Sequence, residues 1–405
     1  MNLSYFISKR INRADPETFS ATIHKVAIAS IGIGLAILII SFLILFGFKS
    51  TIREKIVSFG AHLQLTGYAT TNSYESSPIS TTSDFFQNTD TINYISHSQV
   101  FAYKAGLLST EEEVYGFIMK GVGEDFNREQ FAKNIITGDF INFADTTANN
   151  KIVISKKIAN VLQIEVGEAL QAVFIQESIR RRKLEVVGIY DTGMEDFDEK
   201  IIIGDISLIQ KLNGWDENMV GGFELFVDDF NNLDYYVDQV FEMVGYDYYL
   251  QSVKDRYLEI FDWLSLINQN VYIFLVIILF VASFNMISVL LILIMERTQM
   301  IGTLKALGAT NRQIRNIFIN NGLILVFKGL LWGNLIGIGL CALQFNLQLI
   351  PLDPENYYMN YVPIEWDWLT IFLLNLLTFT IVAVVLLLPA LFISRISPVR
   401  SIRFD

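Results

Sequence analysis

The stretch "ERTQMIGTLKALGATNRQIRNIFI", residues 296–319, joins two long apolar runs in the second half of a 405-residue chain. It carries neither a nucleophile nor a metal-ligand pattern. Three of its apolar residues recur at helical spacing and would form one stripe on a short helix: Ile301, Leu304 and Leu307. Gly308 can end that helix in the left-handed conformation. The stretch therefore predicts a short amphipathic helix between two longer helices.

A second helix is expected to begin directly after the first. In "TNRQ", the side chains of Thr310 and Gln313 can each satisfy the other's backbone N–H, which is the capping-box pattern. Apolar residues then lead this helix into the next apolar run: Ile314, Ile317 and Phe318. A short capped helix held in this way suits docking into a groove on a partner, where a few apolar anchors carry the energy. A helix that merely rests on the membrane surface is the alternative that the pattern leaves open.

The composition of the whole chain indicates a membrane protein. Hydrophobic residues make up 52% of the sequence, and the mean hydropathy is positive, which is unusual for a soluble protein. Four runs of about 20 or more residues can each cross about 30 Å of hydrocarbon. The expected segments are an interfacial helix (1–25), transmembrane helix 1 (26–48), a large domain with stalk helices (49–270), helix 2 (271–295), the segment with the short helix (296–321), helix 3 (322–344), a loop (345–368), helix 4 (369–393) and a tail (394–405).

The distribution of charge sets the expected orientation. There are four Lys or Arg residues before the first span, four between the second and third and three after the fourth, whereas the loop 345–367 has none. The positive-inside rule therefore puts both termini and the segment 296–321 in the cytoplasm. The domain 49–270 then lies outside, with 34 acidic and 18 basic residues. An acidic external domain does not favour nucleic acid as a partner.

Short alternating runs and helix-like stretches are mixed in this external domain, as in "KLEVVGIY" and "SKKIANVLQI", which predicts an α+β fold. Helical periodicity also continues beyond the hydrocarbon at both joins to the domain. At the second join one helix is expected from about Gln251 to Met295. We interpret these extensions as a stalk, and a linker helix packed on its own domain is the alternative.

Two features of the third span concern packing. Gly329, Gly333 and Gly337 repeat the GxxxG spacing, which lets another helix approach closely, although glycines also occur there by chance. Lys328 interrupts the apolar run, and its side chain can snorkel to the nearer interface.

The sequence contains little that indicates a catalytic or metal site. His24, His62 and His97 are scattered and no CxxC pattern occurs, so no metal site is expected. Cys341 alone cannot form an internal disulfide. "YDTGM" (190–194) has no second copy to complete an aspartic protease, and a turn is favoured. No GxxxxGK[ST] motif occurs, so any ATP-driven work must come from another polypeptide. The sequence predicts a non-enzymatic chain with no catalytic residue.

Several stretches resemble one family. "ERTQMIGTLKALGATNRQI" is similar to the coupling-helix signature of MacB/FtsX-like ABC permeases, where this loop docks into a cytoplasmic ATPase. "FVASFNMISVLLILIMERT", "YYMNYVPIEWDWLTIF", "KIVISKKIANVLQIEVGEALQ" and "LLPALFISRISPVRSIR" resemble the lipoprotein-releasing, LolC/LolE-type branch over nearly the whole chain. The family topology of one span, a large external domain and three further spans agrees with that expected from hydropathy and charge.

The resemblance implies a membrane α-helical fold with four transmembrane helices and a large α+β periplasmic domain inserted between helices 1 and 2. It implies a permease in the bacterial inner membrane that extracts lipoproteins from the outer leaflet by mechanotransmission. The implied partners are ABC ATPase subunits, a second permease copy or paralogue, the lipoprotein substrate, membrane lipids and a periplasmic lipoprotein carrier. No cofactor is expected on this chain, because ATP and Mg would be bound by the partner ATPase.

Candidate site residues follow from the resemblance and from position. The ATPase-coupling set is Glu296, Arg297, Ile301, Gly302, Leu304, Lys305, Leu307, Gly308 and Ala309. An apolar cavity for acyl chains is expected between spans 1 and 2, and by position alone its substrate-facing residues would be Leu45, Phe48, Tyr272 and Phe274. Ordinary lipid-facing or packing roles are the alternative for each of these four.

Two departures from the family pattern limit what it implies. Met300 stands where the family usually has an acidic residue, so one polar link to the ATPase is missing or supplied otherwise. The hairpin "ALQAVFIQESIRRRKLEVV" is shorter than the hook by which LolC-type members recruit a carrier, which argues against direct carrier capture. A MacB-like exporter of peptides or small molecules and an FtsX-like envelope regulator keep the same fold. A sensory receptor is disfavoured because the cytoplasmic segments are too short for an output module.

Overall fold

The computed structural model describes residues 19–68, 75, 77–110, 113–143, 150–175 and 179–392. Residues 1–18 of the expected interfacial helix and the whole of the expected tail lie outside the described residues. The chain divides into two compact units, and each is described by itself. The helical unit comprises residues 1–50, 263–351 and 361–405, and the sheet unit comprises residues 51–262 and 352–360.

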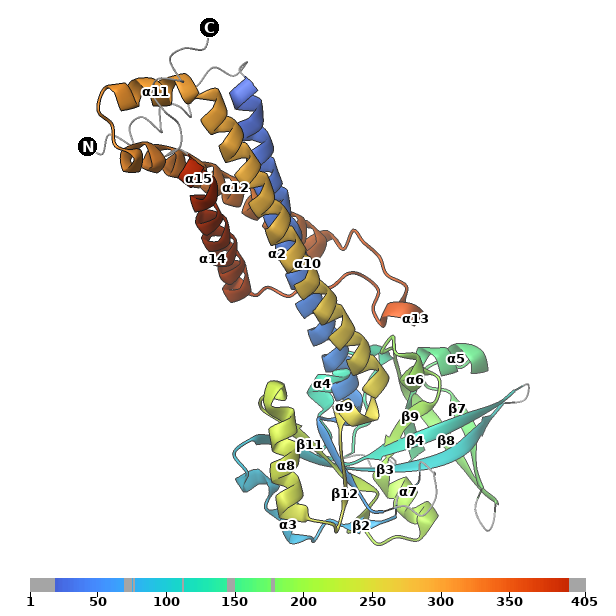
Figure 1. Ribbon diagram of the computed structural model, residues 1–405. Helices are drawn as coiled ribbons and strands as arrows, with labels where there is room; N and C mark the ends of the chain where they lie inside the picture. The colour runs from blue at the N-terminus through green and yellow to red at the C-terminus, as the bar shows by residue number, and fades with distance from the viewer. Residues whose placement is uncertain are drawn as a thin grey trace. The chain divides into compact units, whose positions relative to one another are not determined.

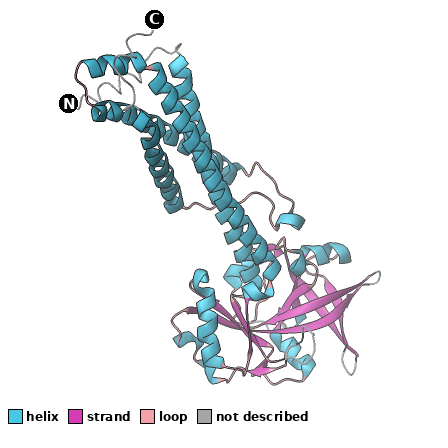
Figure 2. Cartoon of the chain, in the orientation of Figure 1, coloured by secondary structure: helices cyan, strands magenta, loops and turns pink. Residues whose placement is uncertain are grey.

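The sheet unit is built on a mixed sheet (Figure 2). Its strands are β1 (Leu63–Thr66), β2 (Ile79–Ser80), β3 (Ile95–Ser109), β4 (Val114–Val122), β5 (Ile135–Gly138), β6 (Lys151–Ser155), β7 (Ala169–Ile175), β8 (Ile179–Tyr190), β9 (Ile201–Asp205), β10 (Met219–Val220), β11 (Gly222–Val227) and β12 (Tyr249–Ser252). The order in the large sheet is β12-β1-β11-β3-β4-β9-β6-β8-β5, and β7 pairs with both β3 and β8. β4 pairs with β9, and β6 with β8, in parallel.

Helices of the sheet unit are mostly short. They are α3 (Asp84–Gln87), α4 (Arg128–Ala132), α5 (Lys156–Leu162), α6 (Glu195–Asp198), α7 (Ile206–Asn213), α8 (Leu233–Val244), α9 (Val253–Arg256) and α13 (Pro354–Tyr357). The expected alternation is clear in β8, where Leu184, Val186, Gly188 and Tyr190 are buried and the residues between them are not. This period of two directs one face of the strand into the core.

A buried ion pair lies in the core of this unit. Lys120 of β4 contacts Glu224 of β11 at 2.7 Å, and both side chains are at most 1% exposed. Gln64 and Gln99 donate to the same carboxylate at 3.2 and 2.7 Å. Lys120 also donates to the carbonyl of Phe59, near the end of the helix that enters the unit. The pair is thus hydrogen-bonded on several sides, as a buried charge pair must be.

The helical unit contains the long helices (Figure 1). These are α2 (Phe19–Gly60, of which residues 51–60 belong to the sheet unit), α10 (Leu258–Glu296), α11 (Thr298–Ala306), α12 (Asn311–Leu347), α14 (Trp368–Val385) and α15 (Leu387–Phe392). Within the described residues, four helices are long and apolar enough to cross a membrane: Thr22–Gly60, Leu258–Glu296, Asn311–Leu347 and Trp368–Leu391. Together with the large α/β domain after the first of them, this confirms the expected fold class.

The three glycines of the GxxxG pattern face α2. A Cβ added to Gly329 would lie 2.8 Å from Ile31, and one added to Gly333 would lie 2.9 Å from the carbonyl oxygen of Gly32. At Gly337 the added atom would lie 3.1 Å from the Cα of Ala36. The backbones of α2 and α12 therefore approach each other closely because these positions have no side chain.

Two helix boundaries differ from the sequence-based expectation. α10 begins at Leu258 rather than near Gln251, because a capping box of Ser252 and Asp255 starts the separate helix α9 and Tyr257 then leaves the helical conformation. The fourth span is interrupted at Leu386. Pro389 has no N–H to donate to the carbonyl four residues earlier, which explains this break.

Candidate functional site

The segment 296–319 folds into a compact connection between α10 and α12. Arg297 leaves the helical conformation with φ −101° and ψ 22°, and α11 follows at once. The hydroxyl of Thr298 donates to the carbonyls of Met295 at 2.7 Å and Ile294 at 3.2 Å. These carbonyls belong to the last turn of α10, where intrahelical donors are lacking. The start of α11 is thereby fixed to the end of α10.

The inner face of α11 packs on the helical unit itself. Ile301 is 0% exposed, and Gly302 is also buried. Partly buried residues pack on the same apolar core: Met300, Leu304 and Ala309. The apolar stripe expected to anchor a partner is therefore used in large part to hold α11 on its own chain. Ile301 is closed to a partner in this conformation, because it lies in the core that includes Ile294, Ile314 and Phe318.

The outer end of α11 is exposed. Leu307 has 80% of its surface exposed, and Thr303, Ala306 and Gly308 around it are exposed as well. A large apolar side chain held in this way by a rigid helix can serve as an anchor for a protein partner. Of the three residues in the stripe, Leu307 is the one whose surface is open to contact.

The turn that follows confirms two local expectations. Gly308 has φ +95°, and Ala309 donates its N–H to the carbonyl of Leu304 at 2.9 Å, which closes α11. The capping box is present, since Gln313 donates its N–H to the Thr310 hydroxyl and its side chain accepts from the Thr310 N–H. Both ends of α11 are thus held by hydrogen bonds.

Three charged candidates for coupling to the ATPase lie on or beside α11. Glu296 is exposed and Lys305 is half-buried. The Nε of Arg297 is inaccessible to solvent and has no hydrogen-bond partner among the described residues. Met300 packs against the apolar core of the helical unit. Its position therefore favours a role in attaching α11 to that core rather than in a polar link to the ATPase.

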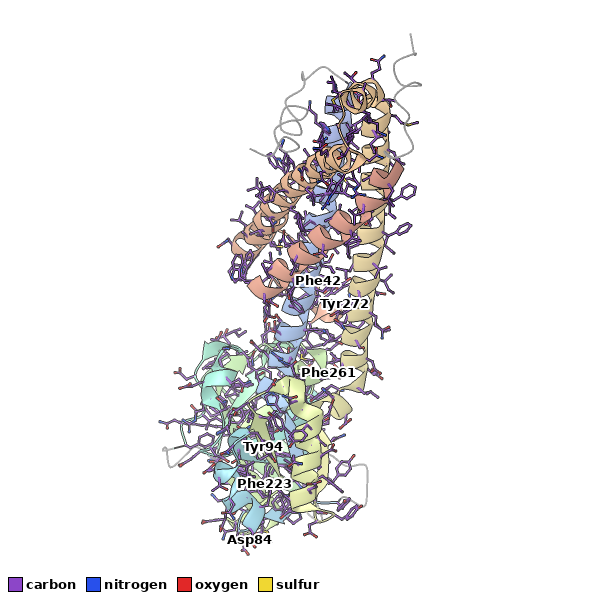
Figure 3. The ribbon with its side chains drawn as sticks, turned by 60° about the vertical axis from the view of Figure 1, so that its left-hand side comes forward. Phe42, Asp84, Tyr94, Phe223, Phe261 and Tyr272 are labelled. Carbon is purple, nitrogen blue, oxygen red and sulfur yellow. The ribbon has the colours of Figure 1, made fainter. Side chains whose placement is uncertain are left out.

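The four substrate-facing candidates fall into two groups by exposure. Leu45 and Phe48 on α2 are 1% and 9% exposed, whereas Tyr272 and Phe274 on α10 are 52% and 55% exposed. The ring of Tyr272 meets Phe42 edge-on, with the centroids 5.7 Å apart (Figure 3). Leu45 therefore lies in the core of the helical unit. Hydropathy could not distinguish the buried residues of α2 from the exposed ones of α10.

An apolar surface runs along α10. Its exposed side chains are Tyr272, Ile273, Phe274, Val276, Ile277, Phe280, Val281 and Phe284. A surface of this kind requires a cover of lipid, apolar ligand or protein.

Polar pairs between the long helices were missed by the sequence reasoning. Asn334 of α12 and Asn375 of α14 exchange two side-chain hydrogen bonds of 2.7 and 2.9 Å. Asn285 of α10 donates to the hydroxyl of Ser30 of α2 at 2.6 Å. A polar residue inside an apolar run was the available signal, because such residues seek partners on neighbouring helices. Across the described residues, no cluster of three His, Cys, Asp or Glu residues could hold a metal ion.

Two family models match the chain, one on each side of residues 228–271. The model described as "MacB-like periplasmic core domain" matches residues 26–227. The model described as "FtsX-like permease C-terminal" matches residues 272–398, which include most of α10 and all of α11 and α12.

Similar proteins are also found over the full length. The chain is 23% identical over 427 residues to the lipoprotein-releasing system transmembrane protein LolC of Neisseria meningitidis serogroup B, covering 100% of both chains. It is 22% identical to LolE of Haemophilus influenzae, covering 99% of each. A crystal structure of the periplasmic region of MacB from Actinobacillus actinomycetemcomitans is 12% identical with a TM-score of 0.34, covering 52% of this chain and 95% of that one. From the two matched models and these full-length relatives, the chain belongs to the MacB/FtsX-like family of ABC transporter permeases.

Proposed function

We propose that this chain is the permease subunit of an ABC transporter that extracts lipoproteins from the outer leaflet of the bacterial inner membrane for transfer toward the outer membrane. The observation that carries the proposal is the match to relatives named as lipoprotein-releasing transmembrane proteins over the entire chain. The exposed end of α11 supports it, since a permease without its own nucleotide site needs such a contact. ATP and Mg would be bound by the ATPase subunits.

The coupling step would begin at α11. An ATPase that grips Leu307 and the exposed residues beside it moves a helix that is fixed by Ile301 to the helical core and by Thr298 to α10. In this scheme Ile301 and Gly302 position α11, and Leu307 contacts the ATPase. The movement would reach the large domain through α2 and α10, because each helix contains residues of both units.

The substrate step requires an apolar receptor. Each acyl CH₂ gains about 0.8 kcal/mol in hydrocarbon, so removing several chains from lipid costs tens of kcal/mol unless another apolar surface receives them. The exposed face of α10 around Tyr272 and Phe274 offers such a surface. Leu45 and Phe48 are buried within this chain. They would contact acyl chains only if α2 and α10 moved apart.

Pairing with a second permease copy or paralogue would enclose the α10 surface and shield the acyl chains. The large domain would lie in the periplasm, as the charge distribution of the sequence favours. A soluble lipoprotein carrier would receive the substrate there.

Leu307→Asp tests the contact with the ATPase. Burying a leucine stabilises a contact by about 1.5–3 kcal/mol, so this change should reduce recovery of the ATPase about tenfold or more when the tagged chain is purified in detergent. Leu349→Asp is the matched control, because Leu349 is an equally apolar residue that is 62% exposed in the loop after α12.

Recovery of the ATPase should be unchanged by Leu349→Asp. If Leu307→Asp also leaves it unchanged, or if no ABC ATPase accompanies the wild-type chain, the coupling proposal fails. An assay of ATP-dependent lipoprotein release then tests the cargo. Release of a lipoprotein supports the proposed function, whereas no release favours a MacB-like exporter of other cargo or an FtsX-like regulator that moves no substrate.

A further inference from the structure

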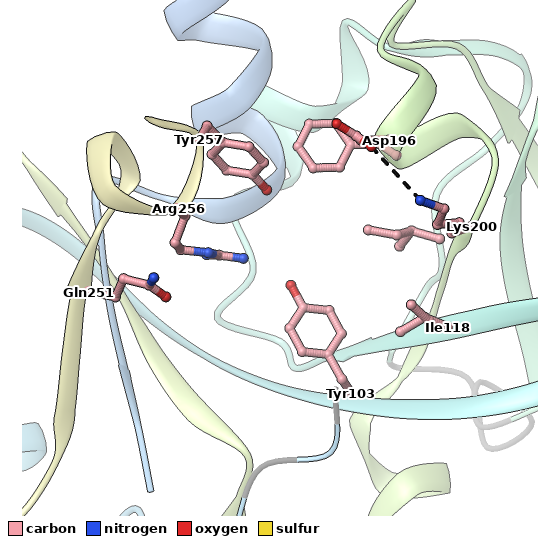
Figure 4. Close-up of a pocket in the computed structure, with 9 residues that line it drawn as sticks. Tyr103, Ile118, Asp196, Lys200, Gln251, Arg256 and Tyr257 are labelled. Atoms are coloured by element: carbon pink, nitrogen blue, oxygen red, sulfur yellow. Dashed lines mark ion pairs between the residues drawn. The ribbon is translucent and has the colours of Figure 1, made fainter. Parts of the chain in front are cut away.

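A pocket of about 340 Å³ lies in the sheet unit, where β3, β4, β12 and α9 meet (Figure 4). Its volume falls in the range of small-molecule sites, about 300–1,000 Å³. The side chains of Arg256, Tyr257 and Tyr103 point into the same space from different elements (Figure 4). The function proposed above uses none of these residues.

Arg256 is incompletely satisfied in this pocket. Its Nη1 atom is inaccessible to solvent and has no hydrogen-bond partner among the described residues. Burial alone would lower the pKa of Arg256, but Tyr257, Tyr103 and Glu224 raise it above its ordinary value. The guanidinium therefore stays charged at neutral pH. Burying a charged guanidinium is costly, and an anion beside it in the pocket would offset that cost.

Two tyrosines add directional donors beside this cation. The guanidinium carbon of Arg256 lies 5.6 Å from the centre of the Tyr257 ring. Burial raises the pKa of Tyr257, so its hydroxyl keeps its proton at neutral pH. Tyr103 presents its hydroxyl from the opposite side of the pocket (Figure 4). Such groups suit a carboxylate or phosphate, whose oxygens accept several hydrogen bonds at once.

The charge around the pocket does not cancel that of Arg256. Lys200 and Asp196 at the rim form an ion pair of 3.9 Å and largely offset each other. Glu224 is already engaged by Lys120 at 2.7 Å. The excess positive charge within the pocket is therefore that of Arg256.

Apart from Gln251, the rest of the lining is apolar. Phe197 and Ile118 are 3% and 8% exposed and form one wall. The ring of Phe197 meets Tyr257 edge-on at 5.6 Å. A ligand that fills the pocket therefore needs an apolar part as well as an anionic one.

We propose that this pocket binds an oxyanion, carboxylate or phosphate, that carries a short apolar group. Arg256 pairs with the oxyanion, the hydroxyls of Tyr257 and Tyr103 donate to it, and the apolar group lies against Phe197 and Ile118.

The pocket lies where the chain enters and leaves the sheet unit. A Cβ added to Gly60, the last residue of α2, would lie 3.3 Å from Nη1 of Arg256. Tyr257 directly precedes α10. A bound ligand would therefore tighten the junction of both helices with the sheet, and it would do so whatever the transporter carries.

Titration of the purified full chain in detergent tests the proposal, with butyl phosphate, butyrate, inorganic phosphate and butanol as probes. Butyl phosphate, butyrate or both should bind saturably, butanol should not, and inorganic phosphate should bind more weakly than butyl phosphate. Arg256→Gln should weaken binding about tenfold or more, as expected for the loss of a charge-assisted hydrogen bond. Lys254→Gln is the matched control on the same helix, since Lys254 pairs with Asp234 at 2.9 Å, and should leave affinity unchanged.

Several results would overturn the proposal. They are saturable binding of neither butyl phosphate nor butyrate, equal binding of the anion to wild type and Arg256→Gln, equal binding of butanol, or, if butyl phosphate binds, equally tight binding of inorganic phosphate. Arg256 would then act only as a cation at the carboxyl end of α2, and its substitution would lower thermal stability equally with and without probe. If Arg256→Gln fails to fold, Tyr257→Phe provides the test. Loss of the Tyr257 hydroxyl donor should weaken the affinity for the anionic probe, and an unchanged affinity would reject the site.

Discussion

At the residue scale, His62 illustrates how a side chain in the sheet unit depends on its charge. Its Nδ1 accepts the N–H of Val227 at 2.8 Å, which requires the neutral imidazole. Its ring also packs against Phe226 and Phe230. Burial, and next the charge of Arg53, lower its pKa from 6.5 to about 4. Protonation therefore breaks a hydrogen bond and places a charge in an apolar environment.

This shift predicts how stability depends on pH. Because the folded pKa is below the unfolded one, the unfolded chain binds the proton more readily, and stability is lost as the pH falls from 6.5 towards 4. The loss at the acid end should be about 3 kcal/mol. His62→Asn keeps an acceptor at the position of Nδ1 but does not titrate. Thermal unfolding between pH 7 and 4 should show a shallower loss for the variant, and parallel curves would contradict the assignment.

At the element scale, the packing of α2 on α12 rests on positions without side chains. Gly333→Ala would place a Cβ 2.9 Å from the carbonyl oxygen of Gly32, so the helices must move apart. Gly339 lies on the same helix with nothing within 4 Å of its added Cβ. Gly333→Ala should destabilise the helical unit by about 1–3 kcal/mol, whereas Gly339→Ala should be neutral or slightly stabilising. Thermal unfolding in detergent measures both, and equal effects would mean that the close approach is unimportant.

The sequence predicted elements best where local rules decide them. The capping box at Thr310 and the left-handed Gly308 depend on residues only a few positions apart. The start of α10 was placed too early, because Gln251 pairs with β1 and belongs to β12, and this pairing depends on a distant strand. The burial of Leu45 and the exposure of Leu307 depend on neighbouring helices, which periodicity alone does not supply.

At the scale of the whole molecule, hydropathy and charge predicted four membrane helices and one large inserted domain, because membrane thickness restricts helix length. The order of the strands was beyond prediction, since β4 and β9 pair in parallel although 78 residues separate Val122 from Ile201 in the numbering. The pocket at Arg256 was missed for the same reason, because its residues come from distant strands and helices. Motif similarity, in contrast, identified the family from short stretches.

The central claim is that an ATPase acts on α11 and that its movement releases lipoproteins from the membrane. ATP-dependent release of a labelled lipoprotein from proteoliposomes, measured together with ATP hydrolysis in the presence of a soluble carrier, tests this most directly. Wild-type complex and Leu349→Asp should release the lipoprotein only with ATP, and Leu307→Asp should release little. Release that is independent of ATP, or equal for Leu307→Asp and wild type, would contradict the account.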